Sequence, residues 1–271
     1  MTDRYAVIGN PIAQSKSPAL HTEFARQFGH DLHYGTLLAT PETFHETVRR
    51  FMSEGGRGMN VTAPFKLAAL DLIDELAPRA QAAQAINTLK FGTTGVYGDN
   101  TDGAGLVRDI QERLGVSLSG RRLLVIGAGG AGRGIFLPLL ETQPSYFLLV
   151  NRTEAKAHAI LGEHAQAGVL EAGPISSAAD GQFDVVIDAT SASLSGAHLP
   201  LPGGVFAPGS LAYELAYGKG DTFFFQDARQ GGAAQCSDGL GMLVGQAAES
   251  FHLWRGVRPD VLSVMELLRA A

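Results

Sequence analysis

The N-terminal part of the chain alternates short apolar runs with stretches of helical periodicity. Apolar runs of about four to eight residues predict strands, and apolar residues spaced three and four apart predict helices that cover a sheet. We expect strands at residues 5–8, 33–38 and 58–62, with helices at 18–28, 42–51 and 64–76. Residues 85–89 and 95–97 predict a hairpin. Strands that alternate with helices predict a mostly parallel α/β sheet.

A second series of the same kind follows a turn-rich joint at residues 115–120. We expect its strands at 123–126, 146–150, 185–188 and 211–215, and helices from about 103 to 114, from about 130, and at 154–163, 241–254 and 259–268. The fold class is therefore α/β, with two α/β domains and the active-site cleft between them.

Composition and charge narrow the class of protein. The chain has 271 residues, 45% of them hydrophobic and 18% charged, with a net charge of −6, which argues against nucleic acid or an anionic membrane as the main partner. The single cysteine, Cys236, excludes an internal disulfide and suits the cytoplasm. Glycines, Arg133 and Pro138 interrupt the longest apolar stretch, so we expect no membrane span. The histidines show no spacing typical of metal ligands, so we expect no metal.

A glycine-rich turn lies between a predicted buried strand and a helix. The stretch Ile126-Gly127-Ala128-Gly129-Gly130-Ala131-Gly132 follows the apolar run 123–126. Glycines let the backbone approach a pyrophosphate, and the helix N-terminus offers amide hydrogens to it. Close packing of strand and helix would also account for the glycines, but this context favours a dinucleotide site.

The end of the next strand indicates which dinucleotide. An NAD site would carry an acidic residue here, whereas the sequence has Asn151-Arg152-Thr153, with Lys156 one turn later. Two cations without a carboxylate favour the 2′-phosphate of NADP, although Arg152 and Lys156 would also be ordinary as solvated surface charges. The sequence predicts NADP.

Polar residues in the first half supply candidate chemistry. Lys66 falls in the first turn of the helix expected at 64–76, the end where the helix dipole disfavours a cation, so Lys66 is a candidate for proton transfer; an exposed lysine is the alternative. Asp102 or Thr101 suits the N-cap of the following helix. Asn87 lies in an apolar run and Gln246 on the stripe of Leu243, Ser250 and Trp254, so both amides are expected to find polar partners.

Two serines flank Lys16 in the stretch NPIAQSKSP at 10–18. Ser17 followed by Pro18 predicts a helix N-cap with proline at the first helical position. Ser15 and Ser17 are two residues apart beside a helix N-terminus, where an anion is favoured, so their hydroxyls are candidates to bind one carboxylate.

Taken in order, these segments resemble one family, the shikimate dehydrogenases. The matching stretches are GNPIAQSKSP (9–18), NVTAPFK (60–66), AINTL (85–89), GDNTDG (98–103), IGAGGAGRG (126–134), NRT (151–153) and DGLGMLVGQAAESFHLWRG (238–256). The resemblance covers nearly the whole chain, and implies reversible, NADP-dependent reduction of 3-dehydroshikimate to shikimate in aromatic amino-acid biosynthesis.

The resemblance also implies residue roles. Lys66 and Asp102 would be the catalytic pair. Implied substrate contacts come from Ser15, Ser17, Thr62, Asn87, Asp102, Tyr217 and Gln246. Cofactor contacts would come from Gly127, Ala128, Gly129, Gly130, Ala131, Asn151, Arg152, Thr153, Lys156, Leu215 and Gly239. The implied domains are 1–102 plus 240–271 for substrate and 103–239 as a Rossmann-type NADP-binding domain, because the C-terminal helices of the family return to the first domain.

Departures from the family pattern leave alternatives open. Gln14 replaces a frequent histidine, Lys156 stands where arginine is commoner, and YELAY (213–217) puts Leu215 in place of a methionine. A paralogue acting on quinate or an aminoshikimate is one alternative, and a non-catalytic NADP-binding regulator is another, although the retained Lys66 and Asp102 argue against the regulator. The sequence leaves a homodimer open.

Overall fold

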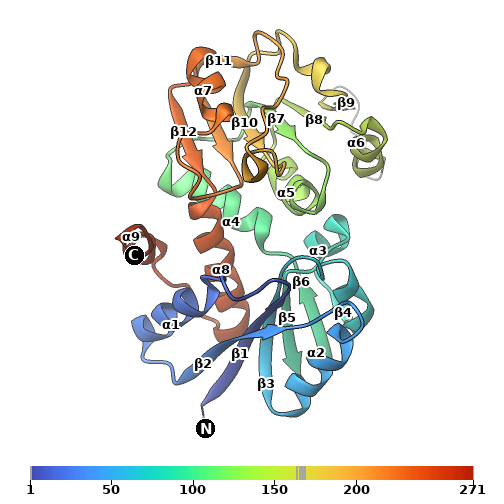
Figure 1. Ribbon diagram of the computed structural model, residues 1–271, viewed down its shortest axis with the longest axis vertical. Coiled ribbons are helices and arrows are strands. Elements are labelled where there is room, and N and C mark those ends of the chain that lie inside the picture. The colour runs from blue at the N-terminus through green and yellow to red at the C-terminus, as the bar shows by residue number, and fades with distance from the viewer. Residues whose placement is uncertain (1, 163, 165–168, 271) are drawn as a thin grey trace. The chain divides into compact units, whose positions relative to one another are not determined.

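The computed structural model describes residues 2–162, 164 and 169–270 (Figure 1). It divides into two compact units, Met1–Gly105 with Leu243–Ala271, and Leu106–Met242. The divisions fall within two helices, α4 (Asp102–Arg108) and α8 (Leu240–Arg255). The first unit is therefore discontinuous in sequence, and the second is inserted into it.

Among the described residues, the first unit is built on a six-stranded sheet of order β2-β1-β3-β5-β6-β4. The strands are β1 (Asp3–Gly9), β2 (Leu32–Leu38), β3 (Gly56–Val61), β4 (Glu75–Leu76), β5 (Thr88–Gly92) and β6 (Gly95–Asp99). β1 is parallel to β2 and β3, whereas β5 is antiparallel to β3 and β6. The sheet is therefore mixed, with the predicted hairpin, β5 and β6, between β3 and the edge strand β4.

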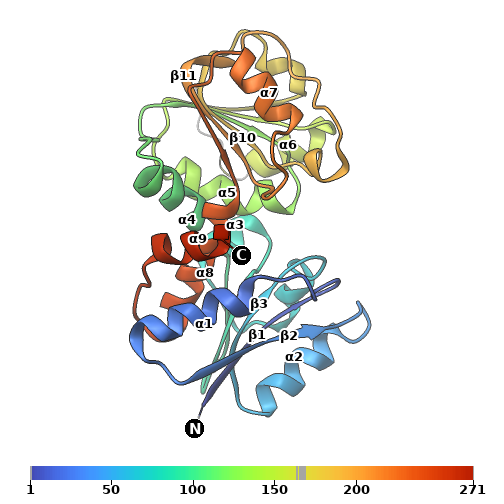
Figure 2. The ribbon, with the colours of Figure 1, turned by 60° about the vertical axis from the view of Figure 1, so that its left-hand side comes forward.

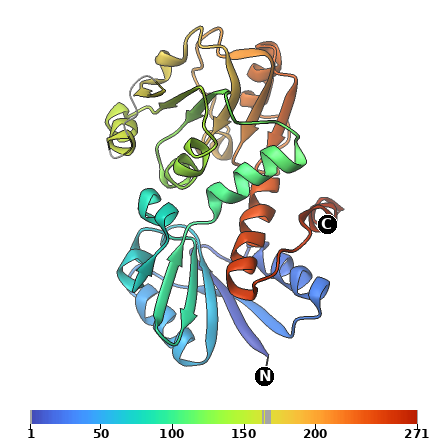
Figure 3. The same ribbon diagram turned by 180° about the vertical axis from the view of Figure 1, so that it is seen from behind.

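Helices cover both faces of this sheet (Figures 2 and 3). α2 (Phe44–Ser53) packs on the face that carries Ala6, Ile8, Met59 and Val61. α1 (Ser17–Phe28) and α8 pack on the other face, where Trp254 of α8 stacks on Tyr5 with ring centroids 4.8 Å apart. The unit also contains α3 (Pro78–Ala83) and α9 (Val261–Ala270).

The second unit contains a sheet of six parallel strands among its described residues, in the order β12-β11-β10-β7-β8-β9. They are β7 (Arg122–Ile126), β8 (Tyr146–Val150), β9 (Leu170–Gly173), β10 (Phe183–Asp188), β11 (Phe206–Glu214) and β12 (Gln235–Asp238). Strands of such a sheet are buried on both faces and read as continuous apolar runs, which is why the sequence reveals the central strands well.

Each face of this second sheet has its own core. α5 (Gly130–Leu140) and α6 (Glu154–Leu161) pack on the face of Leu123 and Val125, together with a π-helical turn (Asp109–Arg113) that continues α4. α7 (Phe223–Gln230) packs on the opposite face through Phe224 and Phe225 (Figure 2). The expected α/β class with a Rossmann-type domain is thereby confirmed.

The helix expected at 64–76 is wrong. This segment forms turns, a 3-10 helix (Ala68–Leu72) and the short strand β4. The Asp74 carboxylate accepts the Val96 N–H at 2.7 Å, and the Asp74 N–H donates to the Val96 carbonyl at 2.8 Å. Pairing with β6 therefore overrides the local helical periodicity.

Two further local predictions, for Lys66 and for Ser17, are also wrong. Lys66 does not lie in the first turn of an α-helix, so the dipole argument for it does not hold. Ser17 is the first residue of α1 rather than its cap, because the N-cap position is Lys16, which makes no side-chain capping bond. Ser15 instead accepts the Ser17 N–H at 3.3 Å.

Several short elements have no counterpart in the sequence prediction. They are α3, β9, α7 and β12. The helix expected at 154–163 is α6, which ends at Leu161; Glu163 is outside the described residues. No helix in the described part of the chain is both long and apolar enough to cross a bilayer.

Candidate active site

Lys66 and Asp102 form an ion pair within the first unit. The Lys66 Nζ lies 2.5 Å from Asp102 Oδ2, and their side chains are 27% and 9% exposed. Lys66 lies in the turn after β3, and Asp102 is the first residue of α4. An ammonium held on a buried carboxylate, yet still reachable from solvent, can exchange a proton with a bound ligand.

Backbone hydrogen bonds bring these two loops together. The Ile86 N–H donates to the Lys66 carbonyl at 2.8 Å, and the Asn87 N–H donates to the Asp99 carbonyl at 3.0 Å. Asn100 donates from its side chain to the Ala85 carbonyl at 3.0 Å. Residues 85–87 are therefore the bridge between the loop that carries Lys66 and the loop that carries Asp102.

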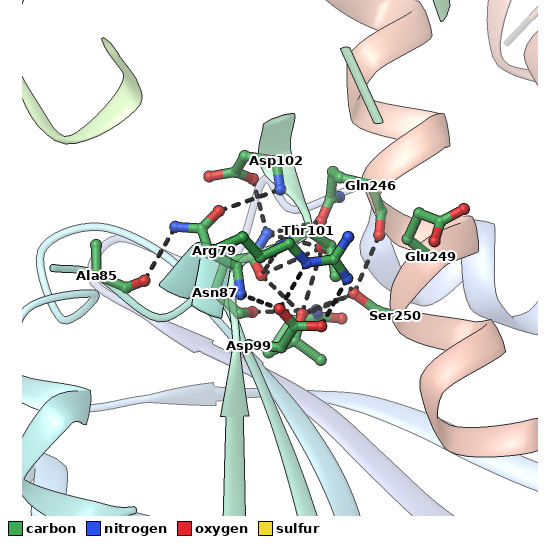
Figure 4. A network of polar contacts seen from close by, with 12 residues as sticks. Arg79, Ala85, Asn87, Asp99, Thr101, Asp102, Gln246, Glu249 and Ser250 are labelled. Carbon is green, nitrogen blue, oxygen red and sulfur yellow. Dashed lines mark hydrogen bonds and ion pairs between the residues drawn. The ribbon is translucent and has the colours of Figure 1, made fainter. Parts of the chain in front are cut away.

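Asn87 is buried and uses its whole hydrogen-bonding capacity (Figure 4). Its Nδ2 donates to Asp102 Oδ1 at 2.7 Å and to Thr101 Oγ1 at 2.9 Å. Its Oδ1 accepts the Thr101 N–H at 2.9 Å and the Thr88 hydroxyl at 2.8 Å. An amide has two hydrogens and two lone pairs, so each of them has a partner within the protein.

Gln246 approaches this cluster from α8. Its Oε1 lies 3.4 Å from Asn87 Nδ2, and its Nε2 donates to the Leu243 carbonyl at 2.9 Å. Gly105 and Gly245 permit the approach, since a Cβ on Gly105 would overlap the Gln246 backbone and one on Gly245 would press on the Gly105 backbone. The structure thus brings Lys66, Asn87, Asp102 and Gln246 together.

Ser15, Ser17 and Thr62 follow the carboxyl ends of two adjacent parallel strands. Ser15 and Ser17 come after β1 and Thr62 after β3. The Asn10 N–H donates to the Ala63 carbonyl at 3.1 Å, and the Thr62 N–H to the Ile8 carbonyl at 3.0 Å, so the two loops are tied side by side. Carboxyl ends of neighbouring strands are the usual place for a ligand in an open α/β sheet.

Tyr217 is the one predicted substrate residue that does not belong to the first unit. It belongs to the second unit, in the loop after β11, and its side chain is exposed. Leu215 and Gly239 lie in the same unit, where the Leu215 N–H donates to the Asp188 carbonyl at 2.9 Å and a Cβ on Gly239 would overlap the Leu215 backbone.

The glycine-rich turn between β7 and α5 fits a pyrophosphate. Gly127 has φ of 111°, a left-handed backbone that favours glycine, and a Cβ on Gly132 would overlap the Gly127 carbonyl. Gly129 and Gly130 face open space and are exposed, as is Ala131. The turn is therefore tight on its inner side and free on its outer side, where α5 begins and its first N–H groups lack helical partners.

The predicted adenosine-phosphate residues divide into two kinds. Asn151 braces the turn, because its Oδ1 accepts the Ala128 N–H at 3.0 Å and its Nδ2 donates to the Thr153 carbonyl at 2.8 Å. Arg152, Thr153 and Lys156 are exposed, and neither cation has an ion-pair partner in the described part of the chain. Both cations are therefore available for an anionic ligand.

The structure also shows buried polar residues that the sequence prediction did not count among the site residues. Asn60, Thr88, Thr101 and Ser250 are buried beside Asn87 and hydrogen-bond with one another. Their signal in the sequence is a polar residue inside an apolar run, as Asn60 is in β3 and Thr88 is in β5. No group of three or more His, Cys, Asp and Glu side chains in the described residues could hold a metal ion.

An aromatic cluster lies behind Asn60. The Tyr34 hydroxyl donates to Asn60 Oδ1 at 2.7 Å, and the His21 ring stacks on Tyr34 with centroids 4.2 Å apart. Burial lowers the pKa of His21 to about 3, and burial raises the pKa of Tyr34 well above its usual range. Both residues are therefore uncharged at neutral pH.

Sequence comparisons identify the family. The shikimate dehydrogenase substrate-binding domain matches residues 7–89, the shikimate/quinate 5-dehydrogenase family model matches 109–195, and the shikimate 5′-dehydrogenase C-terminal domain matches 239–269. The shikimate dehydrogenase (NADP⁺) of Aromatoleum aromaticum is 56% identical over 98% of this chain and 97% of its own length. The chain belongs to the shikimate dehydrogenase family.

Solved structures agree with this assignment. The Ael1 enzyme from Pseudomonas putida is 49% identical and superposes with a TM-score of 0.94 over 98% of both chains. The shikimate 5-dehydrogenase of Thermus thermophilus, solved in complex with NADP(H) and shikimate, is 31% identical with a TM-score of 0.87 over 99% of both chains. The resemblance inferred from the sequence motifs is confirmed.

Proposed function

We infer that this chain catalyses the reversible, NADP-dependent reduction of 3-dehydroshikimate to shikimate. The observation that carries the inference is the Lys66–Asp102 ion pair, 2.5 Å long, in a chain of this family. A non-catalytic NADP-binding regulator would have no need to keep an ammonium paired in this way.

Lys66 is the proposed acid and base. In the reduction, the ketone carbon would receive a hydride from bound NADPH, so the carbonyl oxygen would gain negative charge and require a proton. Lys66 in its ammonium form can donate that proton, and neutral Lys66 can take it back in the oxidation. Asp102 holds the ammonium in place through Oδ2, while Asn87 fixes the carboxylate through Oδ1.

Ser15 and Ser17 are proposed to bind the substrate carboxylate. Both are half-buried at the N-terminus of α1, where amide hydrogens favour an anion. Thr62, Gln246 and Tyr217 are proposed as further substrate contacts. A substrate contact of Asn87 is proposed as well, and would have to replace one of its present partners.

The cofactor residues fit NADP. The pyrophosphate is proposed to lie on Gly127, Ala128, Gly129, Gly130 and Ala131. Arg152 and Lys156 would hold the 2′-phosphate with Thr153, while Asn151 keeps the turn in shape. Leu215 and Gly239 are proposed beside the nicotinamide. A cytoplasmic location and a homodimer belong to the proposal too, the former suggested by the lone Cys236.

One assay tests the function. Purified protein with NADP and shikimate should increase absorbance at the nicotinamide band, and quinate in its place should give a much lower kcat/KM. Faster turnover of quinate would assign the chain to a quinate-specific paralogue, and no turnover of either acid would defeat the dehydrogenase proposal.

A further inference from the structure

Two buried hydroxyl residues lie behind the proposed catalytic pair. Thr88 of β5 and Ser250 of α8 are both 0% exposed, and their oxygens lie 2.8 Å apart. Neither hydroxyl bonds to Lys66 or Asp102 in the structure, but both bond to the residues that surround Asn87. A buried hydroxyl must have partners, so these contacts are specific rather than incidental.

The orientation of the Asn87 amide follows from a backbone donor. The Thr101 N–H can only donate, and it lies 2.9 Å from Asn87 Oδ1, so Oδ1 is the acceptor on that side. Nδ2 therefore points to Asp102 Oδ1, 2.7 Å away. This leaves Asp102 Oδ2 facing Lys66.

Thr88 supplies the second partner that holds Asn87 in this orientation. Its hydroxyl donates to Asn87 Oδ1 at 2.8 Å and accepts from Asn60 Nδ2 at 3.1 Å. The orientation of Asn60 is fixed in turn, because its Oδ1 accepts from Tyr34 and its Nδ2 lies 3.2 Å from the Asn87 carbonyl. Tyr34 thus donates to Asn60, Asn60 donates to Thr88, and Thr88 donates to Asn87.

Ser250 ties this series to α8. Its Oγ accepts from Asn60 Nδ2 at 3.0 Å and has one hydrogen to share among Thr88 Oγ1 at 2.8 Å, the Gln246 carbonyl at 3.0 Å and Thr101 Oγ1 at 3.2 Å (Figure 4). One hydroxyl therefore contacts both threonines that bond to Asn87. It also connects the helix that carries Gln246 to the centre of the sheet.

We propose that Thr88 and Ser250 are positioning residues for the reaction, acting through Asn87 on the Lys66–Asp102 pair. The proposal rests on the proposed function and adds two residues to it. Losing either hydroxyl lets the Asn87 amide turn or shift, and Asp102 then loses the donor that aims Oδ2 at Lys66. Groups that only orient a reacting group commonly change rates about 10–100-fold.

Kinetics of Thr88→Val test the proposal. Valine keeps the shape and removes the hydroxyl, so kcat for shikimate oxidation should fall about tenfold while KM for shikimate changes less than about threefold. Thr88→Ser keeps the hydroxyl and should restore most of kcat. Ser250→Ala should give a smaller loss of kcat, because each of its partners retains another bond.

Matched controls separate positioning from a purely structural effect. Thr47 of α2 is a buried threonine of the same unit with no side-chain hydrogen bond in the described residues, so Thr47→Val should leave kcat unchanged.

An unchanged kcat in Thr88→Val, or a loss that Thr88→Ser shares equally, would overturn the proposal. If Thr88→Val does not fold, Ser250→Ala decides, and wild-type kcat in that variant overturns it. Shikimate oxidation by the unmodified protein in the same assay tests the proposed function separately from the roles of Thr88 and Ser250.

Discussion

At the residue scale, the proposed chemistry depends on one ion pair that no local pattern determines. Lys66 and Asp102 are 36 positions apart in the sequence and meet at 2.5 Å only because residues 85–87 hold both loops. Lys66 does not begin an α-helix, so no helix dipole acts on it, yet it lies beside a buried carboxylate. The family motifs select the same lysine independently of any helix-end effect, and its catalytic role stays a prediction.

Replacing Lys66 should remove the proposed proton donor and leave the proposed substrate site largely intact. Lys66→Ala should lower kcat about 10²–10⁴-fold with a modest change in KM for shikimate, measured by NADPH formation. Lys90→Ala is a suitable control, because Lys90 is an exposed lysine of the same unit. A near-wild-type kcat in Lys66→Ala would exclude Lys66 from the proton transfer.

At the element scale, strand ends place the proposed cofactor residues. β8 ends at Val150, so Arg152 lies in the turn into α6 and Lys156 in the first turn of α6, at the same edge of the sheet as the glycine turn after β7. The sequence predicted these elements because the strands are continuous apolar runs. It did not reveal β9 or β12, which are short edge strands of four residues each.

Arg152 and Lys156 should govern the choice between the two dinucleotides. Arg152→Ala combined with Lys156→Ala should raise KM for NADP about 10–100-fold, since charge-assisted hydrogen bonds to a phosphate are lost. KM for NAD should change little. Arg121→Ala, at the opposite end of the strands, is the control. Parallel increases of KM for both cofactors would show that the two cations do not read the 2′-phosphate.

Parallel pairing of β10 and β11 sets two buried carboxylates side by side. Asp188 and Glu214 are register partners, and each is 1% exposed. Burial, and then the charge of Glu214, raise the pKa of Asp188. The folded state therefore holds the Asp188 proton more tightly than the unfolded chain does. The stability that this proton provides is present at low pH and is lost as pH rises through the folded pKa.

Asp188→Asn should consequently stabilise the protein in a pH-dependent way. Asparagine can still accept the Thr190 N–H, which lies 2.8 Å from Asp188 Oδ1, but carries no charge. We expect little gain in Tm near pH 4 and a gain of about 3 °C at pH 8. The gain at pH 8 corresponds to about 1 kcal/mol, the cost of burying the carboxylate charge that asparagine does not carry. Asp184→Asn, in the same strand, should show no such gain. A Tm difference that is constant with pH would contradict the explanation.

The segment 64–76 shows why local periodicity fails. Its apolar spacing suits a helix, but the Asp74 backbone and carboxylate both bond to Val96 of β6. That contact spans 22 positions, so no window of helical length contains it. Ser250, by contrast, was placed on the inward stripe of α8 from spacing alone, whereas its partners on β3 and β5 became visible only in the fold.

At the scale of the whole molecule, the first unit is completed by the end of the chain. Trp254 of α8 stacks on Tyr5 of β1 and donates from Nε1 to the Leu89 carbonyl at 2.9 Å. A Cβ on Gly58 would overlap its ring, so strand β3 is shaped to receive it. Trp254 therefore helps to fasten α8 to the central strands of the sheet, together with the hydrogen bonds of Ser250.

Removing this side chain should destabilise the fold. Trp254→Ala should lower the free energy of unfolding by about 2–3 kcal/mol, less than for a fully buried tryptophan because Trp254 is half-buried. Trp254 is the single tryptophan, so urea unfolding must be followed by circular dichroism. As a control, Leu262→Ala in α9, where the leucine is 53% exposed, should change the free energy of unfolding by less than about 0.5 kcal/mol. If the two variants changed the free energy of unfolding equally, Trp254 would have no special role in fastening α8 to the sheet.

The saturated amide of Asn87 has a consequence for inhibitor design. A ligand group aimed at Asn87 must displace Thr88, Thr101 or Asp102, and the displaced partner is then left buried without its hydrogen bond. A group aimed at the Lys66 ammonium displaces no buried partner, because that side chain is 27% exposed. Affinity should therefore be easier to gain at Lys66, whereas compounds elaborated toward Asn87 should gain little for each added polar atom.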